Sequence, residues 1–207
     1  MNKWIPSTAC MAILPVAVGF VLPALAGDEQ AGQPLCPVMG ETVDFSLSVA
    51  TDEGPVFVCC KGCIKKMQKS PDKYADGIAA QRKSLVGREK VQVACPISGK
   101  PIDKDVFADV SGQKIYMCCP GCVGKYKAAP DKFAAKLAAS YTYQTKCPLS
   151  GEKIDPTVFA TMPSGLKIYT CCTKCSAKFQ DDPEKYWSGL EKQGFMVSLK
   201  GSMKKAS

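Results

Sequence analysis

The sequence contains no histidine. This absence excludes active sites built on imidazole, such as a Ser-His-Asp triad or an HExxH zinc protease motif. It also excludes imidazole as a metal ligand. Any metal site in this chain must therefore be built from thiolates, with carboxylate or thioether groups in support.

Other catalytic patterns are missing as well. The sequence has no glycine-rich phosphate loop and no nucleophile paired with a base. Three carboxylates recur at similar places, Asp44, Asp103 and Asp155, but each stands alone, which is typical of a turn or cap residue. The aromatic and basic motifs of RNA-binding domains are also absent. The sequence predicts that the protein is not an enzyme and has no nucleic acid partner.

Long apolar runs are scarce, and the one at the start is short. Lys3 precedes an apolar stretch over residues 11–22, and Ala-Leu-Ala at 24–26 follows it. This order is typical of a secretory signal peptide, so residues 1–26 are predicted to be removed after Ala26 and the protein to be secreted or periplasmic. A membrane anchor is the alternative, but the run is short for a span and contains Pro15. No stable membrane span is expected after cleavage.

Cysteine, in contrast, is abundant, with thirteen copies. Cys10 lies in the predicted signal peptide, which leaves twelve. These twelve form three sets of four: Cys36, Cys59, Cys60 and Cys63; Cys95, Cys118, Cys119 and Cys122; Cys147, Cys171, Cys172 and Cys175. A cysteine content of this kind indicates a small scaffold that is cross-linked by metal or by disulfides.

Each set lies in the same longer pattern, Cys-Pro-x-x-Gly, then Cys-Cys-x-x-Cys, then Pro-Asp/Glu-Lys-aromatic. The first two copies align without a gap, and the third has one extra residue near the turn at 163–165. A pattern found three times predicts tandem modules. We call them module 1 (36–86), module 2 (91–140) and module 3 (143–192), and a basic tail (193–207) follows them.

The pattern also predicts the structure of one module. Cys-Pro-x-x-Gly favours a tight turn, because proline fixes φ and glycine permits positive φ. Gly-containing turns at 53–55, 111–113 and 164–165 then precede short β-rich segments, such as Val56-Phe57-Val58, that end at the paired cysteines. A helix is expected to begin at the cysteines, with Met67, Tyr126 and Phe179 on the cysteine face. Pro71, Pro130 and Pro183 should end it and start a second helix.

Modules this small need a cross-link, because their cores barely offset the conformational entropy of folding. Exported cysteines usually form disulfides, so a disulfide scaffold is one hypothesis for the cross-link. Adjacent cysteines are awkward for a disulfide scaffold, however. Cys60 and Cys63 have a metal-knuckle spacing, and Cys59 and Cys63 fall on one helical face. A thiol redox enzyme is a third hypothesis, after a metal site and a disulfide scaffold, although the thioredoxin-like βαβ context is missing.

Charge gives a separate indication. Without Lys3 the chain has 26 basic and 19 acidic residues, a net charge of +7. Many lysines lie within or just after the cysteine clusters in the sequence: Lys61, Lys65, Lys66, Lys69, Lys125, Lys127, Lys174 and Lys178. A solvated helix face explains each single lysine. Together they also match metal–thiolate centres, because a divalent ion bound by four thiolates carries a charge of −2.

The repeated pattern resembles the TRASH/YHS metal-binding module, through Cys-Pro-x-Ser-Gly, the Cys-x3-Cys pair and Pro-Asp-Lys-aromatic. The resemblance implies a small α+β fold of three tandem treble-clef-like zinc-finger modules, each with a knuckle, a β-hairpin and a helix. It implies heavy-metal trafficking, sequestration or resistance, with about one Zn²⁺ or Cu⁺ ion per module held by the twelve cysteines. An envelope metal-efflux or chaperone protein is the expected partner. A disulfide-stabilised extracytoplasmic interaction protein is the alternative.

The chain departs from a treble clef at one position. The second cysteine of the usual first knuckle is replaced by Met39, Ser98 or Ser150. The fourth thiol is supplied instead by the second cysteine of the adjacent pair. Four thiols per module are kept, but their geometry must differ from that of an ordinary knuckle.

Overall fold

The computed structural model describes residues 33–195. The predicted signal peptide (1–26), its cleavage site and residues 196–207 of the predicted basic tail lie outside this part. The described residues form a small α+β structure of short strands and short helices. None of the helices between residues 33 and 195 is both long enough and apolar enough to cross a membrane.

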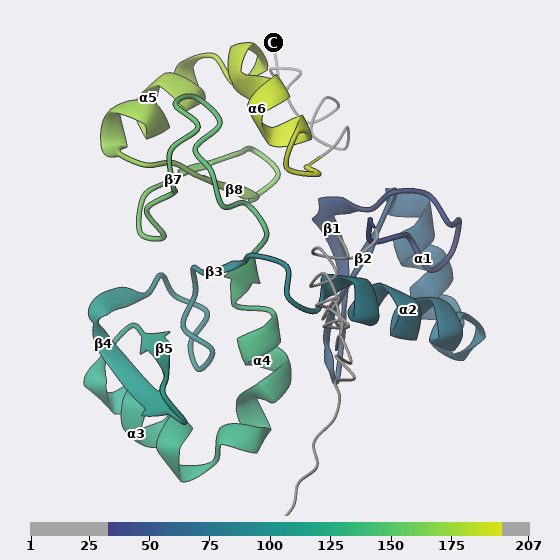
Figure 1. Ribbon diagram of the computed structural model, residues 1–207, viewed down its shortest axis with the longest axis horizontal. Coiled ribbons are helices and arrows are strands. Elements are labelled where there is room, and N and C mark those ends of the chain that lie inside the picture. Colours follow the sequence, from purple (N-terminus) through teal and green to yellow (C-terminus); the bar gives the residue numbers. More distant parts are fainter. Residues whose placement is uncertain (1–32, 196–207) are drawn as a thin grey trace, which may run out of the picture. The chain divides into compact units, whose positions relative to one another are not determined.

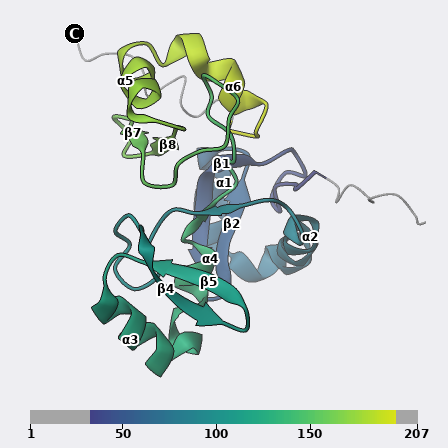
Figure 2. The same cartoon turned by 60° about the vertical axis from the view of Figure 1, so that its left-hand side comes forward.

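The strands pair in two-stranded antiparallel sheets, β1 with β2, β3 with β6, β4 with β5 and β7 with β8. The first, third and fourth of these pairs are labelled in Figures 1 and 2. The strands are β1 (Asp44–Thr51), β2 (Gly54–Val58), β3 (Val91–Gln92), β4 (Asp103–Val110), β5 (Gln113–Met117), β6 (Tyr141–Thr142), β7 (Phe159–Thr161) and β8 (Lys167–Tyr169). The α-helices are α1 (Lys61–Lys69), α2 (Ala75–Leu85), α3 (Pro120–Ala128), α4 (Ala134–Ala138), α5 (Thr173–Asp181) and α6 (Trp187–Glu191). Single turns of 3₁₀ helix, η1 (Pro71–Tyr74), η2 (Pro130–Phe133) and η3 (Glu184–Tyr186), precede α2, α4 and α6.

Each module begins with the predicted tight turn at its first cysteine. The glycine N–H donates to the carbonyl of that cysteine, at 2.8 Å for Gly40 and Gly99 and 2.9 Å for Gly151. The three glycines have φ values of 72°, 71° and 74°, in the left-handed region that glycine tolerates. The prediction from Cys-Pro-x-x-Gly is confirmed, and the backbone geometry is the same in all three copies.

The predicted hairpins are also confirmed. The β-rich segments become β2, β5 and β8, each of which carries the chain to a cysteine pair. Two residues connect β4 to β5, Ser111 and Gly112, both with positive φ as a tight hairpin requires. The β7–β8 connection runs from residue 162 to 166, so the extra residue of module 3 lies in this longer loop.

A helix follows every cysteine pair, as predicted. Met67, Tyr126 and Phe179 are buried on the inner face of α1, α3 and α5. The prolines then start a 3₁₀ turn before the second helix, a tighter beginning than the helix expected from sequence. The eight lysines singled out above are all exposed, which agrees with a solvated helix face.

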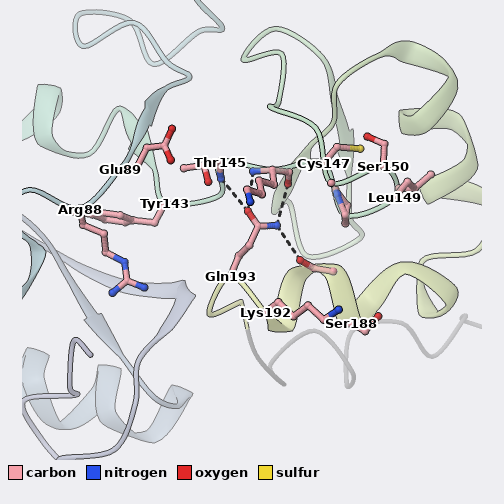
Figure 3. Close-up of a pocket in the computed structure, with 14 residues that line it drawn as sticks. Arg88, Glu89, Tyr143, Thr145, Cys147, Leu149, Ser150, Ser188, Lys192 and Gln193 are labelled. Carbon is pink, nitrogen blue, oxygen red and sulfur yellow. Dashed lines mark hydrogen bonds between the residues drawn. The ribbon is translucent and has the colours of Figure 1, made fainter. Parts of the chain in front are cut away.

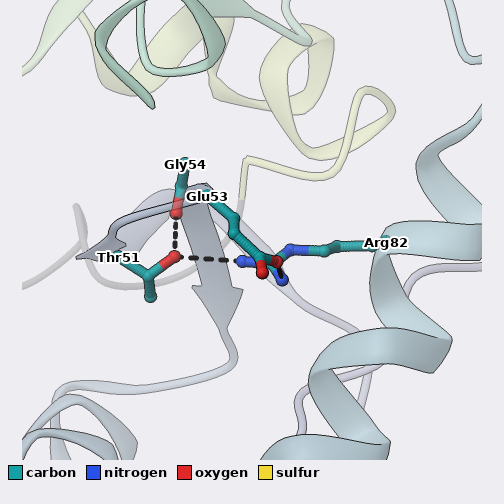
Figure 4. A network of polar contacts seen from close by, with 4 residues as sticks. All are labelled: Thr51, Glu53, Gly54 and Arg82. Atoms are coloured by element: carbon teal, nitrogen blue, oxygen red, sulfur yellow. Dashed lines mark hydrogen bonds and ion pairs between the residues drawn. The ribbon is translucent and has the colours of Figure 1, made fainter. Parts of the chain in front are cut away.

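Side chains fasten the second helix of module 1 to its hairpin (Figure 4). Arg82 on α2 forms an ion pair with Glu53 in the β1–β2 turn. Its second nitrogen donates to Thr51 Oγ1 at 3.0 Å, and Thr51 donates to the Gly54 carbonyl at 2.6 Å. The ion pair is exposed and contributes little by itself, so the network mainly sets where α2 lies on the hairpin.

The three recurring aspartates have the structural role expected of them. Each accepts the N–H two residues later through Oδ1, at 2.9 Å from Asp44, 3.0 Å from Asp103 and 2.9 Å from Asp155. Such Asx turns begin the first strand in modules 1 and 2, whereas in module 3 Asp155 lies four residues before β7. The three carboxylates therefore fix the conformation of the backbone at these positions.

Candidate metal centres

Each module brings three of its cysteine sulfurs together. The Sγ atoms of each group lie within 4.8 Å of one another. The groups, which we call triads, are Cys36, Cys59 and Cys63; Cys95, Cys118 and Cys122; Cys147, Cys171 and Cys175. The first cysteine comes from the tight turn, the second from the end of the hairpin, and the third from the first turn of the helix. Each triad could hold a metal ion.

The spacing of the sulfurs fits a bound metal ion. The Sγ atoms of the second and third cysteines are 3.7 Å apart in every module, as in Cys59 and Cys63. Two thiolates bound tetrahedrally at about 2.3 Å from zinc lie about 3.8 Å apart. The same pair would have to close to about 2.05 Å to form a disulfide. All twelve cysteines of residues 33–195 are free.

The fourth predicted ligand of each module lies outside its triad. Cys60, Cys119 and Cys172 are exposed, and each occupies the N-cap of the helix that follows. The Sγ atoms of Cys60 and Cys119 lie 3.5 Å from the third triad sulfur of their modules. The structure therefore has a three-plus-one arrangement, with the fourth thiol at the surface and next to the triad.

The first cysteine of each triad is the one most prepared to ionise. Burial raises the pKa of Cys95, but hydrogen bonds from the Ser98 hydroxyl and from backbone N–H groups outweigh burial and lower the pKa to about 7. The pKa of Cys147 is lowered to about 7 by the same balance. Burial also raises the pKa of Cys36, and backbone hydrogen bonds outweigh burial and lower it. The tight turn thus stabilises a thiolate.

The third cysteine of each triad holds its proton. Burial, and then hydrogen bonds from neighbouring thiols, raise the pKa of Cys122 and of Cys175 to about 12. The pKa of Cys63 is raised for the same reasons. Within each triad the first cysteine therefore ionises before the third. A metal ion must displace protons when it binds, because thiols are ligands only as thiolates.

The pKa values of the surface cysteines Cys60, Cys119 and Cys172 are lowered for a different reason. The backbone N–H of the third helical residue, at Cys63, Cys122 or Cys175, lowers the pKa of the N-cap thiol. A helix N-terminus favours negative charge. An N-cap position that usually holds Ser or Asp thus holds an exposed thiol with thiolate character.

Three buried glutamines, Gln81, Gln92 and Gln144, hold the segments that carry the ligands in modules 1, 2 and 3. None of them was predicted from the sequence. In module 2 the Gln92 amide accepts the Tyr116 N–H at 2.9 Å and donates to the Tyr116 carbonyl at 2.8 Å and to Ala94 at 3.1 Å. It therefore joins the residue before Cys95 to the strand that ends at the cysteine pair. The signal was present, since Gln33, Gln92 and Gln144 all stand three residues before the first cysteine.

Module 3 repeats this arrangement with Gln144, which pairs with both backbone groups of Tyr169 at 2.9 and 2.6 Å. In module 1 the pairing is made by Gln81 of α2, which contacts both backbone groups of Phe57 at 2.9 and 2.8 Å. Gln33 is exposed there. In every module a glutamine amide thus pairs with the N–H and carbonyl of the strand residue two positions before the cysteine pair. That glutamine precedes the first cysteine in modules 2 and 3 but lies on the second helix in module 1.

A second glutamine holds the ligand turn of module 3. Gln193 accepts the N–H groups of Thr145 and Lys146 at 3.0 and 2.9 Å and donates to the Gly189 carbonyl at 2.9 Å (Figure 3). These bonds join the end of α6 to the residues before Cys147. Gln81 and Gln193 stand at equivalent positions, each seven residues after the aromatic of its Pro-Asp/Glu-Lys-aromatic pattern.

The chain was also compared with protein-family models, with curated proteins and with solved structures, and none of the three comparisons gave a match. The triads themselves are therefore the main indication of function.

Proposed function

We propose that the chain is an exported metal-binding protein of three treble-clef-like modules related to the TRASH/YHS family. Each module holds one thiophilic ion, Zn²⁺ or Cu⁺, in its triad. The observation that carries the proposal is the triad geometry, with a sulfur separation of 3.7 Å repeated in all three modules. The order of turn, hairpin and helix supports the treble-clef assignment.

The surface thiol supports transfer of the ion in preference to permanent storage. Structural zinc sites are closed by four protein ligands, whereas sites that exchange a ligand keep one position open. Here Cys60, Cys119 and Cys172 stand exposed beside the triads. An incoming thiol of a partner protein can meet the ion on this side, so we place the protein in envelope metal trafficking, sequestration or resistance, with an efflux or chaperone protein as partner.

Native mass spectrometry of protein purified from its own compartment tests the proposal. A product that begins at Gly27 and carries three metal ions is the expected result. Circular dichroism with and without chelator and reductant separates metal from disulfides. Chelator should unfold the loaded modules, because metal binding is coupled to folding. No metal uptake by fully reduced protein would contradict the proposal, and unfolding by reductant alone would favour the disulfide scaffold.

The surface thiols allow a matched control. A triple variant, Cys60→Ser, Cys119→Ser and Cys172→Ser, should still take up three ions but should pass them more slowly to a competing dithiol. A triple variant of the first triad cysteines, Cys36→Ser, Cys95→Ser and Cys147→Ser, should lose uptake. Equal loss of uptake in both variants would mean that all four thiols bind the ion as one closed site.

A further inference from the structure

One residue beside each triad differs in chemistry between the modules. It stands three positions after the first cysteine. In module 2, Ser98 Oγ lies 3.2 Å from Cys118 Sγ. In module 3, Ser150 Oγ lies 3.3 Å from Cys171 Sγ. This position therefore contacts a ligand sulfur, and in module 1 it is occupied by Met39.

The backbone places Met39 as it places the two serines. The turn glycines Gly40, Gly99 and Gly151 have φ values within 3° of one another, at 72°, 71° and 74°. Their hydrogen bonds to the first cysteine agree to 0.1 Å. The side chain at position 39 therefore leaves the turn from the same place beside its triad as the serines do.

The Met39 side chain can reach the triad sulfurs. Its Sδ is one atom further from Cβ than a serine hydroxyl is, and methionine has three rotatable bonds. The residue is 55% exposed, so its thioether can turn toward the triad without displacing a packed core side chain. The first triad cysteine, Cys36, is 1% exposed and already fixed.

The two kinds of side chain act differently on a metal ion. A serine hydroxyl donates to a ligand thiolate and so withdraws electron density from it, as outer-shell groups do at metal sites. A thioether has no proton to donate, but it is a soft ligand that suits copper(I) and is not among the usual ligands of zinc. Replacing the hydroxyl with a thioether thus favours copper(I).

We infer that Met39 is a thioether ligand that makes the module 1 triad selective for copper(I) over zinc, a selectivity that module 3 lacks. In module 2 a different thioether, the buried Met117 Sδ, lies 3.9 Å from Cys95 Sγ, so the clean comparison is between modules 1 and 3. The inference rests on the proposed function, since it requires that the triads bind metal. It gives modules 1 and 3 different roles, because the first prefers the softer ion and the second accepts either.

A copper(I) titration tests the inference on the whole chain from Gly27 to Ser207, reduced and without oxygen, in competition with bicinchoninate. The equivalent bound by module 1 should be tighter than the one bound by module 3. Met39→Leu keeps the size of the side chain but removes the sulfur, and it should weaken the module 1 equivalent by about tenfold or more, because even outer-shell changes cost about 10–100-fold. Zinc affinity should stay unchanged. Ser150→Met is the converse variant and should tighten the copper(I) equivalent of module 3.

Methyl NMR of methionine-labelled wild-type protein avoids any folding defect of a variant. Copper(I) and zinc are both diamagnetic, and the Met39 methyl signal is identified by its loss in Met39→Leu. That signal should move with the first equivalent of copper(I) and stay in place with zinc. An unmoved signal, or equal copper(I) binding by wild type and Met39→Leu, overturns the inference while leaving metal binding intact. Absence of copper and zinc uptake in every variant would instead contradict the proposed function.

Discussion

Modules 1 and 2 build the same sulfur triad with different supporting residues. The tight turn, the hairpin and the 3.7 Å sulfur pair agree between them. The buried glutamine comes from α2 in module 1, as Gln81, and from the segment before the first cysteine in module 2, as Gln92. The comparison teaches that the backbone frame around the sulfurs is the repeated feature, whereas the side chains that hold it are interchangeable.

The largest effect should come from removing one triad sulfur. Cys122→Ser should lose one of the three metal equivalents and unfold mainly module 2, because binding and folding of a small metal module are coupled. Cys119→Ser is the matched control, since it removes the neighbouring surface thiol and leaves the triad complete. Native mass spectrometry counts the ions. Loss of all three equivalents in Cys122→Ser would show that the sulfurs form one shared cluster.

The next effect concerns the buried glutamines. Gln92→Leu should lower the free energy of unfolding by about 1–3 kcal/mol, because it leaves the Tyr116 N–H and carbonyl buried without their partner. Gln33→Leu changes the equivalent but exposed residue of module 1 and should stay within about 0.5 kcal/mol of wild type. Urea denaturation of the metal-loaded protein gives both values. Equal destabilisation by the two variants would contradict the different assignment of glutamines in modules 1 and 2.

Much of this frame could be predicted from the sequence because it depends on local rules. Cys-Pro-x-x-Gly determines its own turn, and the alternation of turn and β-rich segments determines the hairpins. The sequence also predicts that the two triad cysteines four residues apart lie close together, but not by the helical face expected, because Cys59 precedes the N-cap of α1 and reaches Cys63 from the end of the hairpin. The glutamines could not be assigned in this way, because Gln33 and Gln92 stand at the same position of the pattern and only packing between distant segments decides which is buried.

The separation of the fourth thiol from its triad was equally hard to foresee. Spacing alone puts Cys60 as close to Cys63 as a knuckle requires, and their Sγ atoms do lie 3.5 Å apart, so four ligands per module stays a prediction. The N-cap conformation of Cys60, with φ −158° and ψ 163°, places its backbone outside the helix and its side chain at the surface. A local backbone angle thus decides which of two adjacent cysteines joins the triad.

A third difference between the modules lies where the second helix meets the cysteine turn. Modules 1 and 3 have Gly77 and Gly189 there, and an added Cβ would lie 2.9 Å from the Pro37 Cα and 2.3 Å from the Pro148 carbonyl oxygen. Module 2 has Lys136 at the equivalent position. The second helix of module 2 therefore tolerates a side chain where the other two require none.

Alanine substitutions test this contact. Gly189→Ala should cost about 1–3 kcal/mol of unfolding free energy, the usual range for overpacking, and Gly77→Ala somewhat less because its contact is longer. Lys136→Ala should be close to neutral, because module 2 already has a Cβ at this place. Thermal unfolding of the loaded protein ranks the three variants. A neutral Gly189→Ala would mean that the turn and the helix move apart at little cost.

The smallest expected effect is a difference in pH dependence between modules 1 and 2. The pKa of Cys95 is about 7, against an ordinary value of 9, and the Ser98 hydroxyl is the largest of the interactions that lower it. Module 1 has Met39 in place of that hydroxyl, so Cys36 should keep its proton to higher pH than Cys95 does. Because the pKa is lowered in the folded state, the contribution of this thiolate to the stability of the folded module before metal binds is complete above pH 9 and is lost as the pH falls through about 7.

Alkylation rates measured against pH, with each cysteine identified by peptide mass spectrometry, test this difference. In metal-free wild type kept folded by a stabilising osmolyte, with folding checked by circular dichroism, Cys95 should become reactive at lower pH than Cys36. Ser98→Ala should move the Cys95 profile to higher pH, and Met39→Ser should move the Cys36 profile to lower pH. Affinity of module 2 for metal should fall more steeply below pH 7, because one further proton must then be displaced. Identical profiles for Cys36 and Cys95 would show that backbone N–H groups alone set both pKa values and that the serine is silent.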